Sequence, residues 1–294
     1  MPNAHHGEVD IYYETFGNPD DPALLLVNGL GSQCINYHAE WCERFVSRGF
    51  FVIRFDNRDV GLSTKFDDVP PDFHAFTEAR RRGEHPEVAY RLPDMADDAI
   101  AVLDELGIDR AHVMGLSMGG MIVQQLAIAH ADRLLTMTSV MSSTGEPDVG
   151  QSTPEAAAIL FGPPATDRAS AIARHLEGNR VFGSPAHFDA ERLTAMAAEA
   201  FDRSFYPVGT VRQILAVASS GTRSEALRSV NVPTLVLHGD ADTLIDISGG
   251  RRTAECIPGA RFVVMEGMGH DYPPAYWDQW VALVGEHAGV GVSA

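Results

Sequence analysis

A five-residue segment with the sequence Gly-Leu-Ser-Met-Gly, residues 115–119, constrains the fold of this chain more than any other feature. It lies between an apolar run at residues 111–116, which predicts a strand, and residues 118–130, which predict a helix. A turn this tight needs glycines two positions either side of Ser117, where other backbone comes close. It places the serine hydroxyl at the carboxyl end of a sheet and at a helix N-terminus, where free N–H groups favour developing negative charge. The segment therefore predicts an α/β sheet with Ser117 as a nucleophile.

Strands alternate with helices along most of the chain. Apolar or alternating runs predict strands at residues 9–15, 23–27, 50–55, 111–116, 134–141, 234–238 and 261–265. Helical spacing of apolar residues predicts helices at residues 35–48, 92–106, 118–130, 247–256 and 274–287. This alternation implies βαβ units, and hence a mostly parallel central sheet flanked by helices on both faces.

The alternation stops in the middle of the chain. Residues 144–228 contain Ala-rich helical stretches that carry Arg and Glu, and no convincing strand. We therefore expect an α/β core formed by residues 1–143 and 229–294, interrupted by an inserted helical cap at residues 144–228. Residues 66–93 are polar and rich in Arg and Pro, and predict a long excursion on the surface.

A serine hydroxyl needs an adjacent base to act as a nucleophile at neutral pH, and the pKa of histidine suits that role. Of twelve histidines, His270 directly follows the last predicted strand, at the edge of the sheet from which an active site would draw residues. His238 ends a neighbouring strand and is the second choice. The base needs a carboxylate to orient it, and the chain order Ser, Asp, His favours Asp242. Asp240 is the alternative, and is expected to cap or brace the same loop.

Acyl transfer also needs two preset donors for the oxyanion of the tetrahedral intermediate. One is expected to be the backbone N–H of Met118, directly after the nucleophile. The other is expected from the loop after the early strand, with Leu30 as the choice, although a plain glycine-rich turn would have the same sequence. Asn28 and Gly29 in this loop, together with His238, are the expected substrate-binding residues.

The composition and charge of the chain limit the classes of partner that it is expected to bind. The net charge of −18 disfavours nucleic acid and anionic membrane surfaces, since both bind basic patches. The three cysteines match no metal-binding spacing and predict neither a metal site nor a disulfide framework. No apolar stretch approaches the roughly 20 residues that span a bilayer, and the N-terminus lacks the pattern of a signal peptide. The cytoplasm is therefore the expected location, and the sequence does not predict an oligomeric state.

These motifs resemble those of the α/β-hydrolase superfamily, over residues 9–143 and 232–287. Residues 56–63, Asp-Asn-Arg-Asp-Val-Gly-Leu-Ser, are similar to its D-x-R-G-x-G-x-S loop. Within the superfamily, the chain is most similar to actinobacterial esterases of the aclacinomycin methylesterase type, at residues 16–19, 21–27 and 115–119. The resemblance implies an α/β-hydrolase fold and a serine hydrolase that cleaves a small-molecule carboxylic ester through an acyl-enzyme intermediate. It implies no metal and no organic cofactor.

Two positions depart from the family pattern. Asn28 stands where the oxyanion loop usually has His, which keeps the backbone donor but changes its support. Asp59 stands where the Arg loop has its first glycine, and adds a carboxylate. We interpret both as changes around the site that bear on substrate choice.

Several activities share such a triad and stay open. A thioesterase, an acyltransferase, a cofactor-free perhydrolase and a carbon–carbon bond hydrolase would differ only in the pocket, and a non-catalytic small-molecule binder is a less favoured alternative. The predicted cap carries a set of large apolar side chains that would suit a bulky apolar substrate, although packing of the cap helices onto the core is expected to account for most of them. They are Phe161, Phe182, Phe188, Met196, Phe201, Phe205 and Tyr206.

Overall fold

The computed structural model describes residues 2–291. Its centre is an eight-stranded sheet with the order β1-β2-β4-β3-β5-β6-β7-β8. The strands are β1 (Asn3–His6), β2 (Val9–Phe16), β3 (Ala23–Val27), β4 (Phe51–Phe55), β5 (Ala111–Leu116), β6 (Leu134–Val140), β7 (Thr234–Gly239) and β8 (Arg261–Met265). β2 pairs antiparallel with β1 and β4, and all other pairs are parallel. The predicted α/β class with a mostly parallel sheet is confirmed.

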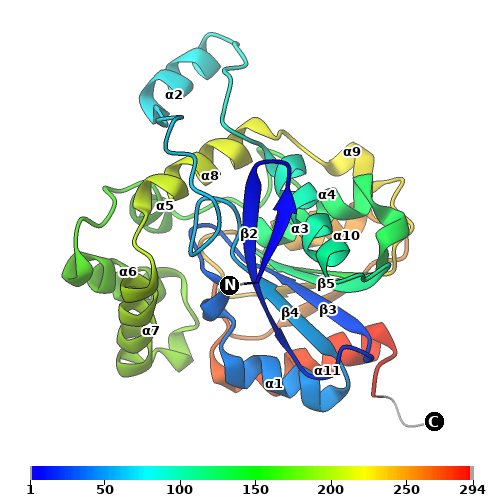
Figure 1. Ribbon diagram of the computed structural model, residues 1–294. Helices are drawn as coiled ribbons and strands as arrows, with labels where there is room; N and C mark the ends of the chain where they lie inside the picture. The colour runs from blue at the N-terminus through cyan, green and yellow to red at the C-terminus, as the bar shows by residue number, and fades with distance from the viewer. Residues whose placement is uncertain (1, 292–294) are drawn as a thin grey trace.

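Helices cover both faces of this sheet (Figure 1). On one face lie α1 (Ala39–Arg48) and α11 (Trp277–Ala288), which contact each other. On the other lie α3 (Leu92–Glu105), α4 (Met118–Ala129) and α10 (Ser248–Cys256). The residues of β3 alternate between the two apolar cores that result, with Leu24 and Leu26 in one and Leu25 and Val27 in the other. A strand buried on both faces has a continuous apolar sequence for this reason.

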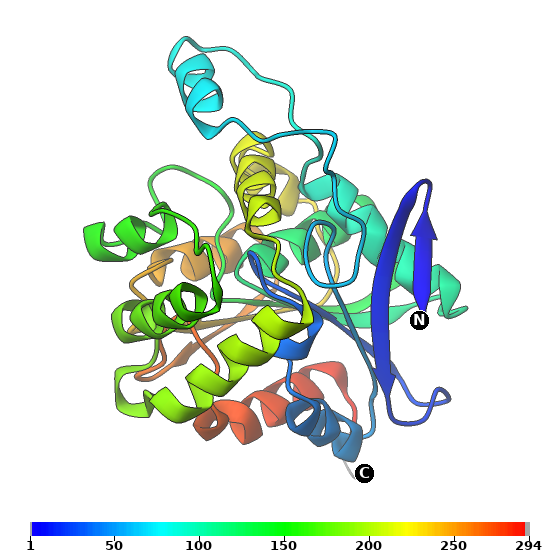
Figure 2. The same cartoon turned by 60° about the vertical axis from the view of Figure 1, so that its left-hand side comes forward.

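Residues 144–228 form helices and no strand. These helices are α5 (Pro154–Leu160), α6 (Arg168–Phe182), α7 (Ala190–Arg203), α8 (Pro207–Ser219) and α9 (Ser224–Leu227). Thr153, Asp167 and Asp189 start α5, α6 and α7, each accepting a backbone N–H bond with its side chain. Figures 1 and 2 show α5, α6 and α7 grouped together beside the sheet. Across the described part of the chain, no helix combines the length and the apolar character needed to cross a lipid bilayer.

The structure differs from the sequence expectations at several elements. β1 was not expected, and it extends the sheet by pairing with β2. The helices expected at residues 35–48 and 274–287 begin only at Ala39 and Trp277, because a 3-10 turn precedes each of them. The surface excursion contains α2 (Phe73–Arg81), whose N-terminus is capped by Asp72 and which projects away from the sheet in Figure 1. The 3-10 turns are η1 (Cys34–Asn36), η2 (Ala131–Arg133), η3 (Pro185–His187) and η4 (Pro274–Tyr276).

A buried ion pair ties α8 to the loop after β4. The carboxylate of Asp59 is fully buried and accepts bonds from Nε and Nη2 of Arg212 at 2.8 and 2.9 Å, and from the Tyr90 hydroxyl at 2.6 Å. Asp59 has φ 72°, in the left-handed region where glycine is favoured and aspartate is tolerated. Asp59 does not line the cavity beside Ser117 and His270. This departure from the family pattern therefore serves to attach α8 to the core.

We expect Arg212→Met to lower the free energy of unfolding by about 3–5 kcal/mol, because it leaves the Asp59 carboxylate buried without its cation. Urea denaturation would measure the loss. Arg168→Met is the matched control, since Arg168 forms the same two-bond pair with Asp202 on the exposed surface of the cap. An exposed pair contributes little, so this control should unfold near the wild-type midpoint. Equal losses in the two variants would contradict the prediction.

Candidate active site

Ser117 lies in the sharp turn between β5 and α4, with φ 55° and ψ −117°. Such a conformation is strained for a residue that has a Cβ atom, and it persists only where the surroundings hold it. The Ser117 N–H donates to the carbonyl of Val140 in β6 at 2.9 Å, and the Ser142 hydroxyl donates to the Ser117 carbonyl at 2.8 Å. These bonds fix the turn so that the Ser117 hydroxyl points out of the sheet's edge.

The two glycines of the motif are required by close backbone contacts. A Cβ atom at Gly115 would lie 2.1 Å from the Gly119 carbonyl oxygen, and one at Gly119 would lie 2.0 Å from the Val27 carbonyl oxygen. Both distances are far below van der Waals contact. The glycines therefore allow α4 to start directly against β3 and β5, which is the reason that the sequence suggested.

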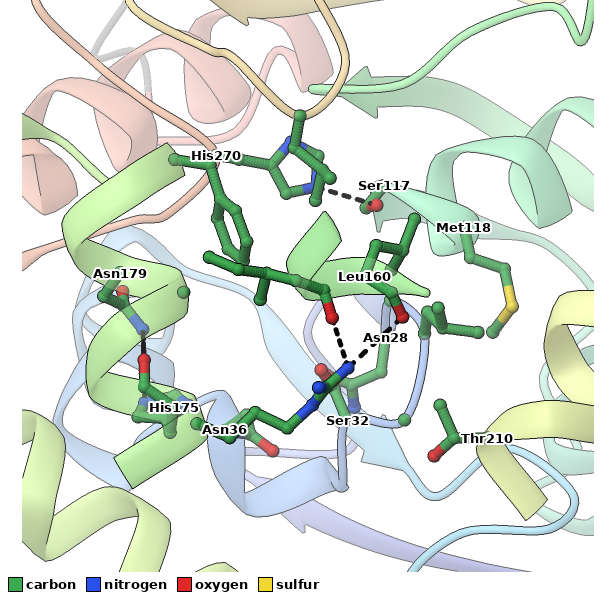
Figure 3. A pocket seen from close by; sticks show the side chains of 18 of the residues that line it. Asn28, Ser32, Asn36, Ser117, Met118, Leu160, His175, Asn179, Thr210 and His270 are labelled. Atoms are coloured by element: carbon green, nitrogen blue, oxygen red, sulfur yellow. Dashed lines mark hydrogen bonds between the residues drawn. The ribbon is translucent and has the colours of Figure 1, made fainter. Parts of the chain in front are cut away.

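Three predicted residues form one hydrogen-bonded chain. The Nε2 atom of His270 lies 2.9 Å from Oγ of Ser117, and its Nδ1 atom lies 2.7 Å from Oδ2 of Asp242. Figure 3 shows the bond between Ser117 and His270 at the edge of a cavity. The backbone N–H groups of Leu244 and Ile245 donate to Oδ1 of Asp242, each at 2.9 Å, and so fix the carboxylate's orientation.

The structure separates the two candidate carboxylates. Asp242 is buried and contacts His270, whereas Asp240 is exposed and accepts the backbone N–H of Gly267 at 2.7 Å. Asp240 therefore braces the loop that precedes His270. Burial alone would raise the pKa of Asp242, but the charge of His270 and hydrogen bonds from His238 and His270 outweigh it and hold the pKa below its usual value. The carboxylate therefore stays ionised in the working range of pH.

His238 lies behind the site and away from the cavity. Its side chain is fully buried, its Nε2 atom lies 2.8 Å from the Ile245 carbonyl and 3.4 Å from Asp242, and it does not line the cavity. The prediction that His238 binds substrate is therefore replaced by a supporting position beside Asp242. The reason is the direction of the side chain, because successive strand residues point to opposite faces.

The loop after β3 lies directly against Ser117. A Cβ atom at Gly29 would lie 3.2 Å from the Leu116 carbonyl oxygen and 3.4 Å from Cβ of Ser117. Asn28, Gly29, Leu30 and Met118 all line the cavity beside Ser117. The Asn28 amide donates to the Phe55 carbonyl at 3.3 Å, which is the changed support expected from the absence of the usual His. The two expected oxyanion donors are therefore close to Ser117 along the chain or in space, since Met118 follows Ser117 and Leu30 follows Gly29.

A cavity of about 1570 Å³ opens above Ser117 and His270. Drug-sized ligands occupy pockets of roughly 300–1,000 Å³, so this cavity accepts a larger molecule. Every one of the seven large apolar residues singled out between positions 161 and 206 lines it. Figure 3 shows that polar side chains share the cavity, among them Asn28, Ser32, Asn36, His175, Asn179 and Thr210. Within residues 2–291, no cluster of three or more His, Cys, Asp or Glu side chains is arranged to hold a metal ion.

Sequence reasoning missed the residues that connect the helices after β6 to the site. Gln213 of α8 is fully buried, accepts the Gly31 N–H at 2.8 Å and donates to the Arg58 carbonyl at 2.9 Å, so it supports the loop after β3. The signal available was the polar pair Arg212-Gln213 inside an otherwise apolar helix. Ser184 also contacts the loop that carries His270, through bonds to Gly269 and Asp271. The only signal in the sequence was that Asp271 directly follows His270.

Comparison with known proteins places the chain in a family. Residues 22–272 match the α/β hydrolase fold family. The rhodomycin D methylesterases DauP of Streptomyces sp. (strain C5) and DnrP of Streptomyces peucetius are each 30% identical to this chain, and each match covers 95% of both proteins. The solved structure of Est816, described as an N-acyl homoserine lactone degrading enzyme, is 26% identical with a TM-score of 0.72, and the match covers 96% of this chain and 98% of that one.

These matches confirm the predicted resemblance, the predicted hydrolase fold and the predicted class, a carboxylic ester hydrolase. The match extends from Pro22, directly before β3, to Tyr272, and so includes Ser117, Asp242 and His270. The chain belongs to the α/β-hydrolase fold family.

Proposed function

We propose that this chain hydrolyses the carboxylic ester of a bulky, mostly apolar acid, with Ser117 as nucleophile, His270 as general base and Asp242 as the acid that orients His270. The observation that carries the proposal is the hydrogen-bonded chain from Asp242 through His270 to Ser117, which opens onto the large cavity. A serine with this support is activated for attack on a carbonyl carbon.

The proposed reaction uses the hydrogen-bonded chain of these three residues. His270 accepts the Ser117 proton as Oγ attacks the ester carbonyl, and Asp242 stabilises the imidazolium that forms. The backbone N–H groups of Leu30 and Met118 bind the oxyanion of the tetrahedral intermediate. The intermediate then expels the alcohol, which takes the proton from His270, and an acyl-enzyme remains. Water activated by His270 attacks the acyl-enzyme, and the acid is released as Ser117 regains its proton.

The alcohol part of the ester is proposed to be small. Both relatives with 30% identity are named methylesterases, which supports methanol as the leaving alcohol. The size of the cavity and its apolar lining support a large acyl part, and the polar groups at Asn28, His175 and Asn179 support hydroxyl or carbonyl oxygens on it. A methyl ester of a polycyclic, oxygenated acid combines these properties.

Residues 144–228 are proposed to form the cap of this site. Side chains from α5, α6, α7 and α8 line the cavity opposite the sheet, so the substrate would be enclosed between these helices and the core.

Cytoplasmic location stays a prediction, and the three free, buried cysteines are compatible with it. A small-molecule ester stays the expected partner, and the net charge of −18 supports the expectation that nucleic acid is not one.

We expect methyl esters of polycyclic aromatic acids to be hydrolysed with kcat/KM about 100-fold or more above that of methyl acetate, because each added apolar group that fills the cavity contributes binding free energy. A panel of methyl, phenyl and thioesters of the same acids, assayed by acid release, would measure this. Ser117→Ala is the control for background hydrolysis. Preference for the small acetate ester, or faster turnover of the thioesters, would contradict the proposal.

A further inference from the structure

The end of α6 lies directly against the loop that carries His270. The N–H of His270 donates to the Phe182 carbonyl at 2.5 Å, and the Phe182 ring meets the imidazole edge-on with ring centroids 6.3 Å apart. A Cβ atom at Gly269 would lie 2.3 Å from the carbonyl carbon of Gly183. The two backbones therefore touch, with no room for a side chain between them.

Ser184, two residues after the end of α6, forms hydrogen bonds to residues on both sides of His270. Ser184 is 1% exposed, and its hydroxyl donates to Oδ1 of Asp271. The same hydroxyl accepts the Gly269 N–H at 3.0 Å, and the Ser184 N–H donates to Oδ1 of Asp271 at 3.0 Å. Because Gly269 and Asp271 flank His270, this single side chain fixes the backbone before and after the proposed base.

The loop that carries Asp242 is held by the same part of the chain. The Thr243 hydroxyl donates to the Val181 carbonyl at 2.9 Å, one turn of chain before Ser184. The backbone carbonyl of Thr243 accepts the N–H of Thr153, the residue before α5, at 2.9 Å. The loops that bear the acid and the base are therefore both bonded to residues of the proposed cap.

We infer that residues 181–184 set the position of His270 relative to Ser117, with Ser184 as a positioning residue that acts through Gly269 and Asp271. Because α6 also lines the substrate cavity, a shift of α6 away from the core carries Phe182 and Ser184 with it and withdraws the support of His270. The base is aligned for proton transfer only when α6 lies against the core. This inference rests on the proposed role of His270 as general base.

The test is the Ser184→Ala variant, measured by the rate at which a fluorophosphonate labels Ser117 and by steady-state hydrolysis of a methyl ester. We expect the labelling rate and kcat to fall together by about 10- to 100-fold, since small displacements of a catalytic group cost that much. KM should stay near the wild-type value, and the melting temperature should change little. Ser184→Thr, which keeps the hydroxyl, should recover most of the labelling rate.

Ser219→Ala is the matched control, because Ser219 also lies in the proposed cap but its buried hydroxyl has no hydrogen-bond partner among the described residues. It should label at the wild-type rate. Wild-type labelling by Ser184→Ala, or a rise in KM alone, would overturn the inference. If Ser184→Ala does not fold, Asp271→Ala removes the same acceptor, and unchanged labelling in that variant would overturn it equally. A wild-type protein that labels but hydrolyses no ester would refute the proposed function and leave this inference intact.

Discussion

The Ser117→Ala variant is expected to lose about 10⁵-fold or more in kcat for an ester that the wild-type protein hydrolyses. The loss is this large because the hydroxyl that bonds to His270 is the proposed attacking group, and an alanine leaves the base with no proton to accept. The proposed oxyanion donors, the N–H groups of Leu30 and Met118, remain in the variant, and we expect them to give a residual rate above that in water. Single-turnover kinetics on the purified variant would measure the loss without interference from traces of wild-type enzyme.

Folding must be controlled in this comparison. Ser47→Ala removes an exposed serine of α1 that bonds only to the Glu43 carbonyl, and it should keep the wild-type rate. Ser117→Gly should be as inactive as Ser117→Ala and at least as stable, because glycine relieves the strain of φ 55° at this position. A Ser117→Ala enzyme with a rate close to that of wild type would show that another group attacks the ester.

Local sequence was sufficient to predict the sheet and to select Ser117 and His270, two of the three residues that the structure joins by hydrogen bonds. The residues around Ser117 form the strand, the turn and the helix that their local pattern predicts, and the glycines record the close contacts of the turn. His270 was selected as the candidate base because a residue after the last parallel strand lies at the same edge of the sheet. These inferences needed only short-range pattern and the rule that carboxyl ends of parallel strands lie together.

Long-range contacts could not be derived in the same way. Asp240 and Asp242 are two residues apart in one loop. Only the three-dimensional structure shows that Asp242 bonds to His270 and that Asp240 bonds to the Gly267 N–H instead. Gln213 supports Gly31 across 182 positions of the sequence. No periodicity or motif encodes such a pairing, because it depends on how the helices after β6 lie on the core. The same holds for α2, whose apolar residues line the cavity although its surroundings are polar.

Asp242→Asn is expected to lower kcat about 10⁴-fold with little change in KM. The geometry gives the reason. Oδ1 of Asp242 accepts two backbone N–H bonds, so the amide oxygen of asparagine must take that place and the NH₂ group must face Nδ1 of His270. His270 then accepts a bond at Nδ1 and carries its proton on Nε2, where it cannot accept the proton of Ser117. The variant would keep its shape and lose the required tautomer.

Asp240→Asn is the matched control for this effect, because it makes the same chemical change two residues away on an exposed carboxylate. Its rate should change by about twofold or less.

Since the pKa of Asp242 is held below its usual value, the acid limb of the wild-type profile of kcat/KM against pH should not arise from Asp242. The stabilisation that this carboxylate contributes is present above its unfolded pKa and is lost as the pH falls through the lower folded pKa. A larger loss in Asp240→Asn than in Asp242→Asn would assign the orienting role to Asp240.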